Sequence, residues 1–128
     1  MRTVKYFTMA VMTMGLVAGL SLFQAADEAK PKYSIEEIME KAHTPPKSSL
    51  LVKVKSGKAS AEQKKQLLAY YEELAKNKPE KGTEADWKKR TGTLVKAAKD
   101  VTDGKEGATT QLAKAASCAA CHKLHKPD

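Results

Sequence analysis

The stretch Cys118-Ala119-Ala120-Cys121-His122 contains both cysteines of the 128-residue chain. Two cysteines separated by two residues and followed at once by a histidine form the attachment motif of c-type haem. On one turn of helix the two thiols can add to the vinyl groups at one edge of a haem, and the next imidazole can bind the iron. The stretch therefore predicts a helix that carries one covalent haem c, with His122 as the proximal iron ligand.

Three other interpretations of the motif are weaker. Cys118, Cys121, His122 and His125 are all zinc-ligand types, but a tetrahedral site would have to take its four ligands from eight consecutive residues. A redox dithiol is expected between a strand and the start of a helix, whereas this motif lies in an alanine-rich segment. A plain disulfide is the third alternative.

Residues 1–26 have the pattern of an export signal. Basic positions near the start are followed by an apolar run that ends at Phe23, and small residues follow at Ala25 and Ala26. This pattern predicts a signal peptide that is cleaved after Ala26, and therefore a periplasmic or otherwise exported protein. The alternative is a retained membrane anchor, which the shortness of the apolar run disfavours. A cleaved chain is not expected to insert stably in a membrane.

The remaining residues, 27–128, are enough for one domain. Cleavage would remove Arg2 and Lys5 and no acidic residue, so the formal net charge of +8 would become +6. Such a basic surface is compatible with ordinary solvation or with docking on acidic redox partner proteins. Nucleic acid is not an expected partner, because no basic run is interleaved with aromatic residues.

Four segments begin with the same spacing, in which a helix-capping residue stands three positions ahead of an acceptor. These pairs are Ser34 with Glu37, Ser60 with Gln63, Thr83 with Asp86, and Asp103 with Glu106. No alternating strand pattern lies between them. The sequence therefore predicts an all-α fold, an antiparallel four-helix bundle that encloses the haem. Pro45-Pro46 should interrupt the first helix after His43.

Apolar residues at helical spacing define the expected core. The second and third predicted helices carry Leu67, Tyr71 and Leu74, and Trp87, Thr91, Leu94, Ala98 and Val101. In the last predicted helix the positions expected to be buried are mostly alanine, at Ala113, Ala115, Ala116, Ala119 and Ala120. Small side chains would leave voids in a close-packed core, so we expect the haem to fill that space.

The export signal, the four capped helices and the late Cys118-x-x-Cys121-His122 motif together resemble the cytochrome c prime family, the four-helix-bundle class of c-type cytochromes. The resemblance covers the layout of residues 27–128 and is specific at the motif alone. The chain is shorter than is usual in that family, and an interrupted first helix is not part of the family pattern. From Leu74 onward the layout also resembles the soluble four-helix b-type cytochrome.

The leading functional expectation is electron transfer by an exported mono-haem cytochrome, with lysines around the motif for docking. The resemblance implies an alternative, a five-coordinate protein that binds NO or CO. The sequence shows neither paired carboxylates nor a nucleophile with a base, which are the arrangements that would indicate an enzyme. Met39 and His43 lie one helical turn apart, and both are candidate distal iron ligands. In an antiparallel bundle Met39 would lie nearer the level of His122, whereas imidazole is the stronger ligand. Monomer and homodimer both remain open.

Overall fold

The computed structural model describes residues 30–127, and the regular elements within this range are six α-helices. They are α1 (Ile35–His43), α2 (Leu50–Lys55), α3 (Ala61–Lys76), α4 (Glu84–Thr102), α5 (Ala108–Ala115) and α6 (Cys118–His125). The predicted all-α class is therefore confirmed. The predicted signal peptide, residues 1–26, lies outside the described residues. In the described part of the chain, none of the helices combines the length and the apolar character that a membrane span requires.

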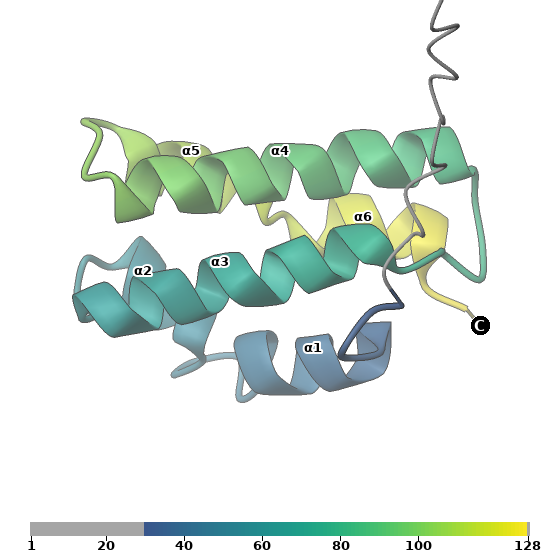
Figure 1. Ribbon diagram of the computed structural model, residues 1–128, viewed down its shortest axis with the longest axis horizontal. Helices are drawn as coiled ribbons and strands as arrows, with labels where there is room; N and C mark the ends of the chain where they lie inside the picture. Colours follow the sequence, from purple (N-terminus) through teal and green to yellow (C-terminus); the bar gives the residue numbers. More distant parts are fainter. Residues whose placement is uncertain (1–29, 128) are drawn as a thin grey trace, which may run out of the picture.

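The two long helices, α3 and α4, pack side by side and run in opposite directions (Figure 1). α1 and α2 pack on α3, and α5 packs on both α4 and α2. The motif helix, α6, lies at the end of the molecule where α3 ends and α4 begins (Figure 1). This arrangement places the motif beside the loop that joins the two long helices.

Three of the four predicted helix starts are confirmed. Ser34 and Ser60 each form a complete capping box with the acceptor three residues later. Thr83 caps α4, because its hydroxyl accepts a hydrogen bond from the backbone N–H of Asp86 at 3.2 Å. These caps satisfy backbone donors that would otherwise have no partner in the first turn.

The predicted interruption of the first helix is also confirmed. α1 ends at His43, and Thr44 has the extended backbone that is expected before a proline (φ −113°, ψ 140°). A new helix, α2, starts after Ser49, whose hydroxyl accepts from the N–H of Val52 at 3.3 Å. The proline pair thus divides the N-terminal helical segment into two.

The fourth predicted start, at Asp103, is wrong. α4 continues to Thr102, and Asp103 ends it by donating its backbone N–H to carbonyls of the last turn. The chain then turns through Gly104 and Gly107, both at positive φ, where glycine avoids the steric cost of a side chain. α5 begins only at Ala108, and its N-terminus has no side-chain cap. Glycine turn geometry, rather than the acidic cap pair, sets where this helix starts.

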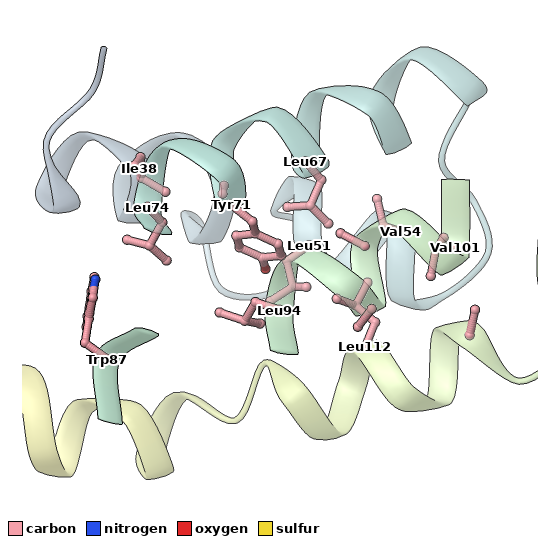
Figure 2. Packing of buried hydrophobic residues seen from close by; sticks show 14 residues of the cluster. Ile38, Leu51, Val54, Leu67, Tyr71, Leu74, Trp87, Leu94, Val101 and Leu112 are labelled. Atoms are coloured by element: carbon pink, nitrogen blue, oxygen red, sulfur yellow. The ribbon is translucent and has the colours of Figure 1, made fainter. Parts of the chain in front are cut away.

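The core is formed by buried side chains from the first five helices (Figure 2). It includes every residue of the two predicted stripes except Thr91, which is also buried but polar. The prediction of an alanine-lined buried face is wrong for three positions, because Ala113, Ala119 and Ala120 are exposed. Ala115 and Ala116 are only half-buried. The chain bends at residues 116–117, between α5 and α6, and the bend breaks the helical period on which that prediction depended.

Candidate cofactor site

The motif of Cys118, Cys121 and His122 occupies the beginning of α6. Cys118 is the first residue of this helix and is exposed, while Cys121 lies one turn later and is half-buried. Both cysteines are free thiols. Burial raises the pKa of the Cys121 thiol. The two thiols and the following His122 therefore come from consecutive turns of one short helix, as the attachment chemistry requires.

A hollow of about 470 Å³ lies beside the motif. This volume is within the range of roughly 300 to 1,000 Å³ that is usual for small-molecule and cofactor sites. Its lining comes from α1, from the start of α4, from the loop before it, and from α6 and the residues after it: Ile35, Glu36, Met39, Glu80, Trp87, Cys121, His122, His125, Lys126 and Pro127. Met39 of α1 and His122 of α6 thus share one hollow, in agreement with the expectation that they lie near one level.

His43, the other candidate distal ligand, does not line this hollow. Its Nε2 lies 3.0 Å from the Tyr71 hydroxyl, and its Nδ1 lies 3.1 Å from the Met39 sulfur. A neutral imidazole suits both partners, because one ring nitrogen can donate to the sulfur while the other accepts from the hydroxyl. Burial, and secondarily the charge of His122, lowers the pKa of His43 to about 4. Burial also raises the pKa of Tyr71.

His125 is a buried anchor that the sequence did not reveal. Its side chain is 2% exposed, its Nδ1 donates to the Lys81 carbonyl at 2.9 Å, and its Nε2 donates to Asp86 at 2.7 Å. Both partners are acceptors, so the ring satisfies both only when each nitrogen carries a proton. The ring also meets Trp87 edge to face, with centroids 5.2 Å apart. His125 therefore fixes the end of α6 against the start of α4.

Asp86 joins this anchor to α4. Its Oδ2 accepts from Arg90 Nε at 2.6 Å as well as from His125. These two hydrogen bonds, the one from Arg90 first, lower the pKa of the Asp86 carboxyl. The sequence marked Asp86 only as the acceptor of a helix cap.

The other interpretations of the motif gain no support from this geometry. Within residues 30–127, no group of three or more His, Cys, Asp or Glu side chains could hold a metal ion. His125 uses both ring nitrogens in hydrogen bonds, which removes one of the four ligands that a zinc site would need. The cysteines do not form a disulfide, and the described chain contains no strand ahead of the motif.

A haem fits the donor set of this site. The Cys121 thiol, the exposed His122 imidazole and the Met39 thioether line one hollow, and the Cys118 thiol belongs to the preceding turn of α6. These are the groups that c-type attachment and axial ligation use. The hollow is also lined by Trp87, whose buried Nε1 has no hydrogen-bond partner among the described residues.

A second hollow, of about 320 Å³, also has Cys121 in its lining. Its lining contains three basic side chains and one acidic one, namely Lys89, Arg90, Lys114 and Asp86. Cys121 therefore lines both this basic hollow and the hollow that contains Met39 and His122.

No protein-family model, no curated protein and no solved structure matches this chain.

Proposed function

We propose that this protein is an exported mono-haem c-type cytochrome that transfers electrons, folded as a four-helix bundle of the kind that the cytochrome c prime resemblance implies. In that bundle, α1 and α2 together count as the first helix, which is interrupted. α5 and α6 together count as the fourth helix, which is also interrupted. The observation that carries the proposal is the hollow shared by Met39, Cys121 and His122. It brings a candidate proximal ligand, a candidate distal ligand and an attachment thiol together from both ends of the described chain.

In this proposal each residue has a definite task. Cys118 and Cys121 hold the cofactor covalently, His122 binds the iron through its imidazole, and Met39 supplies a thioether from the facing helix. A bound haem supplies a one-electron couple at this place. The buried side chain of Trp87 lines the hollow and keeps water from its inner part. Exposed lysines, among them Lys114, Lys123 and Lys126, favour acidic redox partner proteins.

Gas binding is the second candidate, and the contact between Met39 and His43 favours it. The Met39 sulfur lies 3.1 Å from His43 Nδ1, so it already has a polar neighbour on its own helix. If this contact persists in the haem-loaded protein, the sixth iron position stays open to a diatomic ligand. The same contact weighs against His43 as the distal ligand.

Haem attachment is tested by expressing the full chain together with a c-type maturation system. We expect a haem-stained band on a denaturing gel for the wild type, and none for the double variant Cys118→Ala, Cys121→Ala. Ser117→Ala is the matched control, because Ser117 adjoins the motif and its side chain makes no cap hydrogen bond. A colourless wild-type band together with stoichiometric zinc in the purified protein would overturn the proposal.

A further inference from the structure

Three side chains form a series of contacts that leads from the core to the hollow beside α6. Tyr71 of α3 is fully buried (0% exposed) and belongs to the hydrophobic core (Figure 2). Its hydroxyl lies 3.0 Å from His43 Nε2, and His43 Nδ1 lies 3.1 Å from the Met39 sulfur. Met39 in turn lines the hollow together with His122. The candidate distal ligand is therefore in contact with an imidazole that a core residue holds in place.

The two partners of His43 decide which of its ring nitrogens carries the proton. A thioether sulfur can accept a proton but has none to give, so the contact with Met39 is a hydrogen bond only when Nδ1 is the donor. The Tyr71 hydroxyl can donate to Nε2, and a neutral ring that accepts there has its one proton on Nδ1. Within residues 30–127 this hydroxyl has no other hydrogen-bond partner. Tyr71 therefore favours the tautomer in which His43 donates to the sulfur.

We propose that His43, oriented by Tyr71, is a positioning residue that weakens Met39 as an iron ligand and keeps the sixth iron position exchangeable. The inference rests on the proposed function. The lone pairs through which the sulfur would bind iron are the same electrons that accept the N–H of His43. The sulfur must therefore leave the imidazole to reach the metal, or bind the metal with less electron density. In both cases CO replaces Met39 more easily than it would replace a thioether without a hydrogen bond.

Two pairs of variants of the haem-loaded protein test this inference. His43→Leu removes the donor, whereas His43→Asn keeps an amide N–H close to the place of Nδ1 and should restore the wild-type behaviour. Tyr71→Phe removes only the hydroxyl and preserves the ring that fills the core, so it tests the contact even if His43→Leu does not fold. Tyr70→Phe is its control, because the Tyr70 hydroxyl contacts the exposed Gln66 and Tyr70 lines neither hollow.

The measured quantity is the dissociation constant of CO for the ferrous protein. A Met39 sulfur that is free of the imidazole competes better with CO. The constant should therefore rise about twofold to tenfold in His43→Leu, the range that one hydrogen bond is worth, and by a smaller factor in Tyr71→Phe. The low-spin fraction of the ferric spectrum should rise in the same two variants. His43→Asn and Tyr70→Phe should match the wild type in both measurements.

A background without Met39 shows whether His43 acts through the sulfur. Met39→Ala and the double variant Met39→Ala, His43→Leu should bind CO equally, because the second change then has no ligand to act on. A CO dissociation constant that is unchanged or lower in His43→Leu, or that rises as much in the Met39→Ala background, would overturn the inference and leave the proposed function intact. A wild-type chain that takes up no haem would instead remove the proposed function, and the two failures are therefore distinguishable.

Discussion

The half-buried His43 and the buried His125 have different kinds of hydrogen-bond partner. His43 lies between a sulfur and a hydroxyl, and burial lowers its pKa to about 4, so it is neutral at ordinary pH. His125 lies between a carbonyl and a carboxylate, and both of these require a donated proton. Neither resembles the exposed His122, whose ring remains accessible for a metal. Local partners therefore distinguish the proposed iron ligand from two imidazoles that are held by hydrogen bonds.

The sixth ligand can be decided by substituting residues 39 and 43. If Met39 binds the iron, the ferric wild type is low-spin and shows the weak long-wavelength band of methionine ligation. Met39→Ala should then abolish the band and give a high-spin spectrum, because an alanine cannot reach or bind the metal. His43→Ala is the matched control on the same helix and should keep the band. A low-spin spectrum that is lost only in His43→Ala would assign the ligand to His43 instead. A wild type that is high-spin and binds CO would favour gas binding.

Asp100 offers a prediction on acid stability away from the site. Its two oxygens accept from Lys96 at 2.7 Å and from Lys105 at 2.8 Å. The hydrogen bonds from Lys105 and then Lys96 lower the pKa of Asp100 from 3.8 to about 2. Because the folded-state pKa is the lower one, its contribution is present above pH 3.8 and is lost as the pH falls toward 2.

Thermal melts at pH 4 and pH 2 check this expectation. The fall in Tm between the two should be smaller in Asp100→Asn than in the wild type, by a modest amount because the pair is at the surface. Asp103→Asn is the control, since it removes a carboxylate near the same turn without breaking either hydrogen bond to Asp100. An Asp100→Asn protein with the full wild-type fall in Tm would contradict the argument.

At the scale of single residues, sequence spacing identified the motif but not Trp87 and His125, which lie beside it. Cys118, Cys121 and His122 follow a known chemical pattern, and a pattern can be read without coordinates. Trp87 and His125 acquire their roles only through contacts with distant parts of the chain. His125 meets Asp86, which is 39 positions away in the sequence, so no local spacing could have paired them.

At the scale of elements, α6 depends on a close approach to the loop that joins α3 and α4. Gly82 has φ +85°, and a Cβ added there would lie 2.8 Å from the Leu124 carbonyl oxygen and 2.7 Å from His125 Nδ1. Gly57 has a similar φ of +74°, but a Cβ added there would meet nothing within 4 Å. The two glycines share a backbone requirement and differ in the space around them, which makes them a matched pair.

Alanine at these two positions separates backbone strain from steric contact. Gly57→Ala should lower the free energy of unfolding by about 1 kcal/mol, the usual cost of a left-handed residue with a side chain. Gly82→Ala should cost about 2 to 4 kcal/mol, since α6 must also shift. Urea denaturation of the haem-loaded protein measures both. Equal losses of unfolding free energy in the two variants would show that α6 does not restrict the space at Gly82.

Element boundaries were predictable where a side chain or a proline sets them. Ser34, Ser60 and Thr83 cap helices as expected, and Pro45-Pro46 interrupts the first one. Prediction failed where glycine turns and chain bends set the boundaries, as at Gly107 and at residues 116–117. A bend has no side-chain signal of its own. Because the bend was not predicted, the burial of the alanines in the last predicted helix was also predicted wrongly.

At the scale of the whole molecule, the distribution of charge bears on partner choice. The chain has a formal net charge of +8. Lys114 lines the basic hollow and Lys126 lines the hollow with His122, so both lie at the candidate site. Lys65 is also exposed, but it lies in the first half of α3, toward the end of the molecule away from α6 (Figure 1). Substitution of Lys114 or Lys126 therefore changes the charge at the candidate site, whereas substitution of Lys65 changes the net charge alone.

Oxidation of the reduced protein by ferricyanide tests whether the lysines at the site guide electron transfer. The anion should react most rapidly at low salt and more slowly as ionic strength rises to about 0.15 M, where the screening length falls to about 8 Å. Lys114→Glu and Lys126→Glu should each slow the reaction at low salt several-fold, because charges near the point of electron exit dominate steering. Lys65→Glu changes the net charge by the same amount at a remote position and should have a clearly smaller effect. Equal slowing by all three variants would mean that overall charge alone attracts the oxidant, and the haem edge would then have to be sought away from α6.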